Sequence, residues 1–312
     1  MISARGAKRQ TRISVEYAAY RFPSSFVNPS ARYITTCPVG CSSTLQPTAI
    51  LLTEGPLLRC TACGQLASSC SVEAHAASLD KWNTYAGTDP DARSVERYRT
   101  VVTRRLDGVL ALLGKGNSAP KLLDVGCSSG ALLAVARSMG FEVRGVEPAP
   151  DAAQSAQRAG FEVIQGLLHE AAYADASFDA CVMFEILEHV NEPLALMREC
   201  ARVLRPGGVL VVNTPNAASW TARAMQARWA GFSLMAMGGH ASFFNPASLT
   251  LLAERSGFSV ARVETRNVRF YEKGQSGALA YRAAKIAAQT LALPARWAGA
   301  GHDLLVYMIK DK

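Results

Sequence analysis

The sequence predicts an α/β protein with a parallel sheet and helices on both of its faces. From Lys121 onward, short apolar runs alternate with segments of helical periodicity, which is the pattern of repeated strand–helix units. The first run, Lys121–Val125, is followed by a glycine-rich turn and then by a helical segment. Five of the eight cysteines fall between residues 37 and 70, before this alternation begins. We therefore expect a small N-terminal unit ahead of a larger α/β domain.

The elements of the large domain follow from its apolar runs and from the residues that stop helices. Gly140, Gly160 and Pro206-Gly207-Gly208 each follow a segment of helical spacing. We expect strands at residues 121–125, 142–147, 162–165, 180–184 and 209–213, and helices at 131–139, 151–159 and 193–204. Further along, we expect a helix at 246–255, strands at 259–268 and 304–310, and an alanine-rich amphipathic helix at 277–292.

Composition divides the chain into four zones. Residues 1–35 are basic, residues 36–72 hold the cysteine cluster, residues 73–118 have helical periodicity, and residues 119–312 form the α/β domain. Within the last zone, residues 217–245 are expected to be an insertion on the substrate side, because they are rich in Ala, Met and Trp and interrupt the alternation.

The charge of the chain is positive and unevenly placed. Of the net +8, six basic and one acidic side chains lie in residues 1–35, and twelve basic and five acidic ones follow residue 216. Such flanks attract nucleic acid, an anionic membrane surface or a phosphorylated substrate, or they form an ordinary solvated surface. The basic N-terminus has no apolar segment after it and no run of eighteen apolar residues occurs, so we expect a cytoplasmic protein without a transmembrane segment. The oligomeric state is not indicated.

The turn between the first strand and its helix is the strongest sign of a binding site. Asp124 ends the strand, and Gly126 and Gly130 bracket a turn that opens directly into the helix. Glycines let the backbone approach a ligand, and the helix N-terminus offers free N–H groups. The next strand ends in Glu147, whose carboxylate can accept hydrogen bonds from both hydroxyls of a ribose. Ligands of open α/β sheets bind at this edge, which favours ribose binding over the alternative that Glu147 only caps the next helix.

Four segments, LLDVGCSSG, GVEP, SFDACVMFEILEHV and VLRPGGVLVVNTPN, resemble the class I S-adenosylmethionine (SAM) dependent methyltransferases. The resemblance covers residues 121–258 and implies a Rossmann-like seven-stranded sheet whose last strand is antiparallel. It also implies a SAM site. The methionine part would lie among Asp124, Gly126, Cys127 and Gly130, the ribose at Glu147, the adenine beside Pro148 and Gln165-Gly166-Leu167, and the methyl group near Phe184 and Glu185.

The sequence departs from this family at two positions. The middle glycine of the usual turn is Ser128, and the acidic residue often found after the third strand is replaced by Leu167-Leu168-His169. The first change keeps a small residue in the turn. The second leaves the adenine contact undefined.

Acidic and histidine side chains follow the fourth strand at helical spacing. Glu185, Glu188 and His189 would share one side of a helical turn, and His240 offers a further nitrogen. Oxygen and imidazole ligands together suit a divalent ion such as magnesium, as in related magnesium-dependent O-methyltransferases, where the metal acidifies a substrate hydroxyl. Alternatively, Glu188, His189 and His240 act as base or substrate contacts, or they only hold the loop.

The clustered cysteines have the spacing of a zinc ribbon. Cys37 and Cys41 form one pair and Cys60 and Cys63 a second, which together make a closed site of four sulfur ligands. Such zinc is structural, and Cys70 is expected to be a spare thiol. A ribbon either grips RNA or packs against the catalytic domain and shapes the mouth of the site.

These features favour a SAM-dependent methyltransferase, and the acceptor has alternatives. The Glu/His cluster and the apolar insertion, which contains Trp220 and Trp229, favour O-methylation of a small-molecule, sugar, lipid-linked or quinone-like hydroxyl. The ribbon and basic ends favour an RNA methyltransferase, although the tetrapeptide N/D-P-P-Y/F of several base-methylating enzymes is absent. A third alternative is an inactive interaction protein on this fold. The amphipathic helix near residue 285 either packs into the core or touches a membrane.

Overall fold

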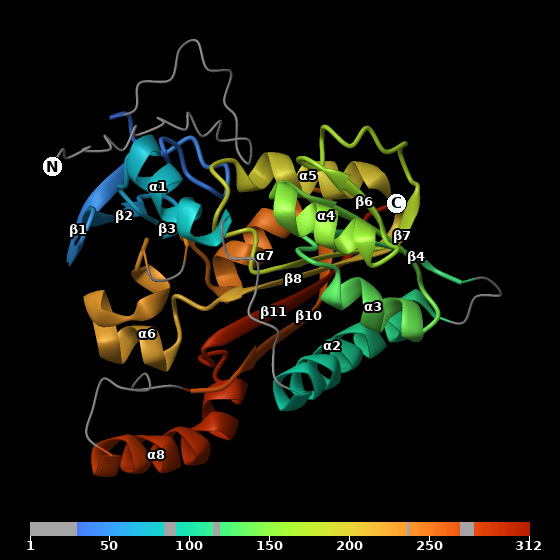
Figure 1. The fold of residues 1–312 in the computed structure, drawn as a ribbon. Coiled ribbons are helices and arrows are strands. Elements are labelled where there is room, and N and C mark those ends of the chain that lie inside the picture. Colours follow the sequence, from blue (N-terminus) through green and yellow to red (C-terminus); the bar gives the residue numbers. More distant parts are fainter. Residues whose placement is uncertain (1–29, 84–91, 115–118, 236–237, 269–277) are drawn as a thin grey trace, which may run out of the picture.

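A seven-stranded sheet forms the centre of the protein, whose computed structural model describes residues 30–83, 92–114, 119–235, 238–268 and 278–312 (Figure 1). Strands β4 to β8 are parallel, and the last strand is antiparallel to both of its neighbours. The strand order is β10-β11-β8-β7-β4-β5-β6. The predicted class I sheet is therefore confirmed. The strands are β4 (Lys121–Val125), β5 (Glu142–Glu147), β6 (Glu162–Gln165), β7 (Phe178–Phe184), β8 (Leu204–Pro215), β10 (Phe258–Arg266) and β11 (Asp303–Lys310).

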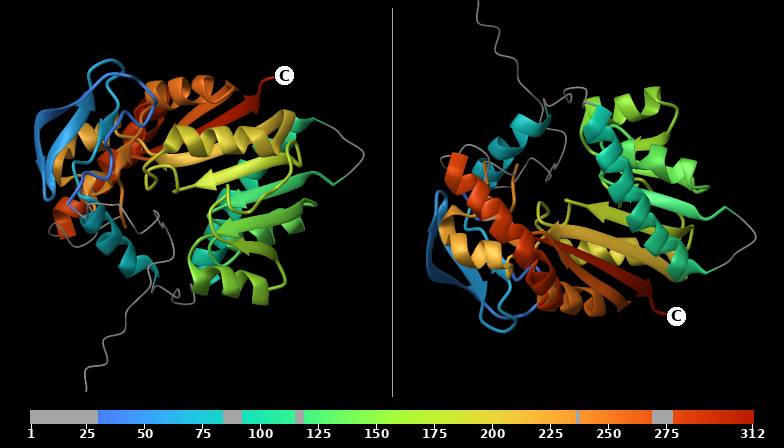
Figure 2. Two further views of the ribbon diagram at one scale, coloured as in Figure 1. Left: turned by 90° about the horizontal axis from the view of Figure 1, so that it is seen from above. Right: turned by 90° about the horizontal axis from the view of Figure 1, so that it is seen from below.

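Helices cover both faces of this sheet (Figure 2). On one face, Leu106 and Leu133 from the helices pack on Leu122 and Val209 from the strands. This face carries α2 (Ala92–Leu113), α3 (Ala131–Ser138) and α4 (Pro150–Arg158). The other face carries α5 (Pro193–Val203) and α7 (Pro246–Arg255). The central strands β4, β7 and β8 are mostly apolar because both of their faces are buried, and this is why the sequence shows apolar runs there rather than alternation.

Strand β8 is longer than the sequence pattern predicts. It begins at Leu204, directly after α5, whereas we expected a strand only from Val209. Pro206-Gly207-Gly208 does not separate the helix from the strand. It bulges out of the strand, since Leu204 pairs with Phe178 and Val209 with Ala180. A bulge keeps the pairing on both sides of it, and the sequence signal for it is the same as for a turn.

A second, four-stranded sheet is made from two distant parts of the chain. Strands β1 (Leu45–Leu52), β2 (Gly55–Cys60) and β3 (Leu66–Ala67) come from the cysteine-containing segment. The fourth strand, β9 (Ser242–Phe243), comes from the insertion after β8 and pairs antiparallel with β3. Helix α1 (Val72–Asn83) follows β3. We call the sheet β1-β2-β3 with its cysteines the ribbon, and it is joined edge to edge with the methyltransferase-like part.

The apolar side chains of the insertion are used for this junction. Trp229 is 2% exposed and packs in a cluster with Leu57 of β2 and with Phe232 and Phe243. The Trp229 ring meets Phe232 edge-on at 4.7 Å between centroids. The insertion also contains α6 (Trp220–Met225) and the short 3-10 turns η1 (Gln226–Arg228) and η2 (Ala230–Phe232). Trp229 is therefore an anchor between insertion and ribbon.

The chain end places one amphipathic helix at the periphery. Helix α8 (Ala278–Trp297) follows β10 and precedes β11 in the chain. It projects away from the sheet (Figures 1 and 2). Among the described residues, no helix is both long and apolar enough to cross a membrane. The basic residues 1–29 lie outside the described residues, and the cytoplasmic location stays a prediction.

Candidate functional site

The turn after β4 is a tight, left-handed backbone structure. Gly126 and Gly130 have φ of 77° and 87°, and Ser128 between them has φ of 48°. The N–H groups of Gly126 and Cys127 both donate to the carbonyl of Val146 on β5, at 2.8 and 3.1 Å. A Cβ at Gly126 would lie 2.2 Å from Ile186, so this position accepts only glycine without displacement of its neighbour. The turn leads straight into α3, whose N-terminus is held at Gly130.

Two buried carboxyl groups lie beside this turn. The carboxylate of Glu147 accepts the N–H groups of Ser128 (2.8 Å) and Ala149 (2.9 Å) with its two oxygens. Glu147 thus does hold the start of α4, as its capping interpretation requires, and each oxygen keeps a lone pair for a ligand hydroxyl. Burial raises the pKa of Asp124 to about 8, and the negative charge of Glu147 adds to this effect. Burial also raises the pKa of Glu147, and its hydrogen bonds from Ala149 and Ser128 oppose that effect.

Other expected contact residues surround the same turn with different roles. The thiol of Cys127 packs against Gly145, where a Cβ would lie 2.5 Å from its sulfur, so Cys127 offers a ligand only its backbone. Gly166 follows β6 with φ of 146°, and its N–H donates to the Glu147 carbonyl at 3.1 Å. Pro148, directly after β5, is half-buried, and Phe184 ends β7.

Helix α2 adds two residues that sequence reasoning missed. The Arg105 guanidinium lies over the Phe184 ring, 4.6 Å from its centroid. Burial lowers the pKa of Arg105, and the nearby carboxylates of Glu185 and Asp303 oppose that effect. The side chain of Tyr98 keeps 43% of its surface exposed, and its partial burial and the neighbouring Asp124 carboxylate raise its pKa. The sequence offers little indication of a role for Arg105, because it adjoins the apolar stripe of α2 and resembles an ordinary cation on the flank of such a helix.

The residues after β7 and the histidine of the insertion meet in one buried group. Glu188, His189 and His240 each place a ligand atom within 4.8 Å of the others. Among the described residues Glu185, which we expected as a ligand, is not in this group. Its exposed side chain lies next to Glu188 and raises the pKa of that carboxyl, after the larger effect of burial. Glu185 also has φ of 57°, and its N–H donates to the Asn213 carbonyl at 2.8 Å.

The polar atoms of this Glu188–His189–His240 group have few partners. Both carboxyl oxygens of Glu188 and the Nδ1 of His189 are buried without a hydrogen bond among the described residues. The Nδ1 of His240 lies 3.1 Å from the Gly231 carbonyl, which only accepts, so Nδ1 carries the proton. Its Nε2 therefore presents a lone pair toward Glu188, 3.7 Å away. Burial lowers the pKa of His189 to about 4 and that of His240 to about 3, which keeps both rings neutral.

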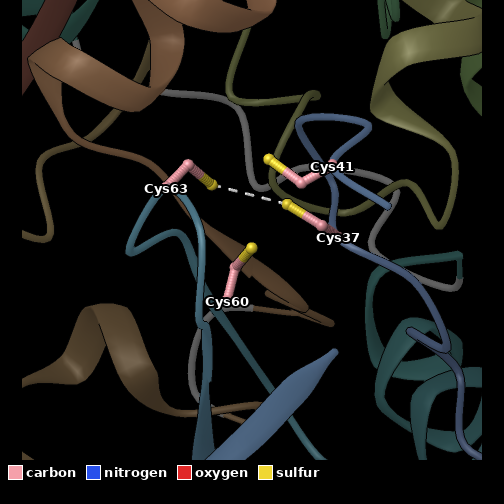
Figure 3. Close-up of side chains that lie close together, drawn as sticks. All are labelled: Cys37, Cys41, Cys60 and Cys63. Carbon is pink, nitrogen blue, oxygen red and sulfur yellow. Dashed lines mark hydrogen bonds between the residues drawn. The ribbon is translucent and has the colours of Figure 1, made fainter. Parts of the chain in front are cut away.

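The four ribbon cysteines also converge (Figure 3). Cys37, Cys41, Cys60 and Cys63 place their sulfur atoms within 4.8 Å of one another, from two loops that face each other. The Sγ atoms of Cys37 and Cys63 are 3.6 Å apart. Tetrahedral zinc with bonds of about 2.3 Å to sulfur requires edges of about 3.8 Å, so the residues fit this metal. Cys70 is buried and outside the group.

A family comparison decides what kind of protein this is. The methyltransferase-domain family matches residues 95–263, more than half of the chain. The chain belongs to the class I SAM-dependent methyltransferase family. The matched region contains the glycine turn, Glu147 and both members of the buried group that follow β7.

Curated relatives of this methyltransferase carry a more specific name. The ubiquinone biosynthesis O-methyltransferase of Xanthomonas oryzae pv. oryzae is 35% identical over 150 residues, covering 46% of this chain and 62% of the relative. The protein of the same name from Xanthomonas campestris pv. campestris is 33% identical over 156 residues, covering 47% of this chain and 64% of that protein. The chain thus spans less than two thirds of the relatives it matches.

Solved structures share the fold of this methyltransferase. A protein from Pyrococcus horikoshii has a TM-score of 0.51 at 16% identity, covering 74% of this chain and 99% of that one. A SAM-dependent methyltransferase from Thermotoga maritima, described as a possible histamine N-methyltransferase, has a TM-score of 0.50 at 18% identity, covering 75% and 96%. At these identities the likeness shows the fold alone.

The methyltransferase also has an acidic residue, Glu170, at the tip of β6 that the sequence pattern did not indicate. The carboxylate of Glu170 accepts the N–H of Leu167 at 2.7 Å and lies near Gly166. The family's acid is expected directly after the strand, whereas Glu170 comes three residues after Leu167 and is brought back by a turn. Spacing along the chain could not reveal this.

Proposed function

We propose that this methyltransferase transfers the methyl group of SAM to a hydroxyl of a small, quinone-like acceptor. The curated relatives named as ubiquinone biosynthesis O-methyltransferases support this acceptor class. One observation carries the assignment of the acceptor side. Within the part of the chain that the structure describes, the Glu188–His189–His240 group holds buried polar atoms without hydrogen-bond partners, just after the carboxyl end of β7. Buried polar atoms are costly unless a ligand satisfies them.

The SAM side of this proposal uses the residues around the glycine turn. Backbone groups of Gly126, Cys127 and Gly130 surround the methionine part, with Asp124 near its cationic groups. Glu147 accepts the ribose hydroxyls. Glu170 is the proposed partner of the adenine amino group, which the sequence left without one. These assignments follow from the carboxyl edge of β4, β5 and β6, where ligands of open α/β sheets bind.

Methyl transfer needs a positioned nucleophile and a destination for its proton. Neutral His240 has a lone pair on Nε2, which lies 3.7 Å from Glu188, and neutral His189 has a buried Nδ1 without a hydrogen bond among the described residues. Either nitrogen is suited to accept the hydroxyl proton, and Glu188 is suited to orient it. Such proton transfer contributes about 10²–10⁴-fold to a rate.

The same three residues fit a divalent metal. One carboxylate and two imidazoles, whose buried ligand atoms on Glu188 and His189 have no hydrogen bond among the described residues, are a ligand set of mixed oxygen and nitrogen. Two nitrogens suit zinc, manganese or cobalt better than magnesium, which prefers oxygen. When bound, a metal would lower the pKa of the acceptor hydroxyl.

Variants of the buried group test this proposal. With labelled SAM and a catechol as probe acceptor, Glu188→Gln and His240→Asn are expected to lower turnover by about 10²-fold or more, while calorimetric SAM affinity stays within about twofold. Glu192→Gln, four residues from Glu188 and exposed, is the matched control and should retain full activity. A chelator arm separates a metal from a base. Unchanged turnover in both variants would disprove the assignment, and label entering only an RNA fraction would favour the RNA alternative.

We further propose that the acceptor is lipid-linked and reaches the site at an anionic membrane surface. On α8, Ile286, Leu293 and Trp297 are 63%, 63% and 86% exposed and recur at spacings of seven and four residues, which is one side of a helix. The exposed Arg282 and Lys285 flank them, and residues 278–297 contain no acidic side chain. Cations beside an outward apolar stripe match an anionic lipid interface.

The position of α8 supports a role near the acceptor. Just after α8, the carbonyls of Gly299 and Ala300 accept hydrogen bonds from Asn216 Nδ2 and the Trp220 N–H, both 3.0 Å. Asn216 directly follows the carboxyl end of β8, which is the edge that bears the site. The buried side of the helix is alanine-rich, with Ala295 fully buried.

Vesicle binding tests this second proposal. The protein is expected to sediment with phosphatidylglycerol vesicles and not with phosphatidylcholine ones, and Trp297→Ala with Arg282→Gln should reduce sedimentation at least fivefold. Arg228→Gln, an exposed cation on the insertion, is the control. Equal sedimentation with both vesicle types would refute the preference for an anionic surface, and no sedimentation with either would refute membrane docking and leave a soluble acceptor.

A further inference from the structure

The ribbon touches the acceptor side of the methyltransferase through continuous hydrogen bonding. Strand β2 ends at Cys60, a member of the cysteine group, and pairs with β3. Strand β3 in turn pairs with β9, with Ala67 opposite Ser242, and the Ser68 N–H donates to the Ala241 carbonyl at 2.8 Å. The pairing of β2, β3 and β9 thus fixes where β9, which begins two residues after His240, lies relative to Cys60.

Strand β9 and the residue before it are hydrogen-bonded to the loop after β7. The N–H groups of Ala241 and Ser242 both donate to the carbonyl of Glu188, at 2.8 and 3.0 Å. The ribbon edge, His240 and Glu188 are therefore linked by backbone bonds alone. Two of the three members of the buried group take their positions from this strand.

A stacked aromatic pair makes a second, independent connection. The rings of Tyr33 and His75 stack at 3.6 Å with an interplanar angle of 12°. The Tyr33 hydroxyl donates to the His189 carbonyl at 3.1 Å, and the His75 ring is hydrogen-bonded to the Gly239 carbonyl at 3.0 Å. Tyr33 precedes the ribbon and His75 follows it in α1. The pair holds the loop of His189 and the segment before His240 at the same time.

The ends of the ribbon are closed onto each other and onto the large domain. The Tyr33 N–H donates to the Cys70 carbonyl at 2.9 Å, and the Val72 N–H donates to the Ala31 carbonyl at 2.9 Å. Arg255 of α7 donates to the Val39 carbonyl (2.8 Å) and to the sulfur of Cys41 (3.2 Å). Arg255 thus ties α7 to the loop that carries Cys37 and Cys41.

A segment of this size needs a metal to keep its loops together. Strand β3 has only two residues, and the two cysteine loops have no disulfide. Small units with little core of their own draw their stability from metal binding. Without the metal, Cys60 at the end of β2 is no longer held in place, and the positions of β3 and β9, which depend on β2, are no longer fixed.

We propose that Cys37, Cys41, Cys60 and Cys63 hold one zinc ion whose function is to position Glu188, His189 and His240. The zinc is structural and remote from the reacting atoms, and Tyr33 and His75 are positioning residues. The SAM site, on β4, β5 and β6, does not use the ribbon. Loss of zinc therefore disables the acceptor side and spares SAM binding.

Hydrogen exchange on the full chain tests this without knowledge of the acceptor. The inference uses the proposed function only in naming the acceptor side, because amide exchange is measured without substrate. The purified protein is expected to contain one zinc per chain. After removal of zinc, amides in 186–190 and 239–243 should exchange at least about tenfold faster, those in 122–130 and 142–149 should not change, and SAM affinity should stay within about twofold.

Each other outcome overturns the proposal. A chain purified without zinc that also fails to take up added zinc has no such site. Unchanged amide exchange at residues 239–243 after zinc removal would show that the metal does not position the acceptor side. A parallel loss of SAM binding shows general unfolding rather than positioning.

A conservative variant keeps the test valid if cysteine variants fail to fold. Tyr33→Phe retains the stacked ring and removes the bond to the His189 carbonyl. We expect full zinc content, unchanged SAM affinity and about threefold or greater acceleration of exchange in 186–190. With a catechol as probe acceptor, the acceptor KM should rise and the SAM KM should not. Gln46→Ala, on the exposed side of β1, is the matched control and should change none of these. Unaltered exchange in the Tyr33 variant would eliminate the aromatic connection.

Discussion

The backbone N–H of Ser128 donates a hydrogen bond to Glu147 Oε2 at 2.8 Å, which ties the glycine turn after β4 to the tip of β5. Ser128 occupies the position of the family's middle glycine and adopts a left-handed φ of 48°. The bond compensates for a conformation that costs a non-glycine residue roughly 1–2 kcal/mol. The family's glycine is thus replaced at the expense of backbone strain.

Ser128→Gly is expected to stabilise the protein by about 0.5 kcal/mol, because relief of strain exceeds the extra entropy of glycine in the unfolded chain. Thermal unfolding monitored by circular dichroism measures this. Ser129→Gly is the matched control: Ser129 is not among the residues with positive φ, so glycine there should destabilise. A lower melting temperature for Ser128→Gly would contradict the strain.

Gly126→Ala is expected to abolish detectable SAM binding, since its Cβ would lie 2.2 Å from Ile186 at a left-handed φ. Titration calorimetry measures the loss. Gly160→Ala is the control. Gly160 also has a positive φ, but a Cβ there would meet no atom within 4 Å, so this variant has the backbone strain without the clash and should leave SAM affinity unchanged. If Gly126→Ala bound SAM normally, the turn would not be the SAM site.

SAM affinity is expected to rise with pH up to about pH 8. Burial raises the pKa of Asp124 to about 8, so its carboxyl is protonated below that pH in the free protein. The cationic ligand favours the ionised form, and binding therefore releases a proton below pH 8, which improves affinity by up to about tenfold per pH unit. Calorimetry in buffers of different ionisation enthalpy measures that proton. Asp124→Asn should abolish the release, and a release that persists in this variant would assign the proton elsewhere.

The same shift makes the ligand-free protein less stable as pH rises. The folded pKa of Asp124 lies above its unfolded value of about 3.9, so the native state binds more protons between these two values. Stability is therefore highest at the acidic end of this window and falls toward pH 8. Asp124→Asn should flatten the fall in urea-unfolding free energy between pH 5 and 8, and an equally steep fall in the variant would disprove this cause.

Glu170→Gln is expected to weaken binding of S-adenosylhomocysteine by about fivefold through loss of a charged acceptor for the adenine amino group. S-inosylhomocysteine, which lacks that group, should bind the wild type and the variant equally. Glu162→Gln, on β6 and paired with Arg144, is the control. Equal weakening for both ligands would show that Glu170 acts only through the Leu167 backbone.

Local sequence was sufficient for most of the central sheet. The segments of β4, β5 and β6 each contain apolar residues that are buried, and glycines stop the helices between them, so β4, β5, β6 and α3 were located to within a residue or two. The turn at Gly126 and the acid at Glu147 were visible because each is adjacent in sequence to the strand that positions it. The bulge in β8 was missed, because Pro206-Gly207-Gly208 signals a turn whether or not pairing resumes after it.

Only the tertiary structure decided what surrounds the acceptor. The pairing of Ala67 with Ser242, the stacking of Tyr33 on His75, and the meeting of Glu188 with His240 join residues far apart in the chain. Arg105 over Phe184 and Glu170 at the tip of β6 depend on how a helix or a turn packs. The sequence determined the sheet and the glycine turn because neighbouring residues encode them. The acceptor side arises from long-range contacts, and no local pattern specifies which distant segments meet.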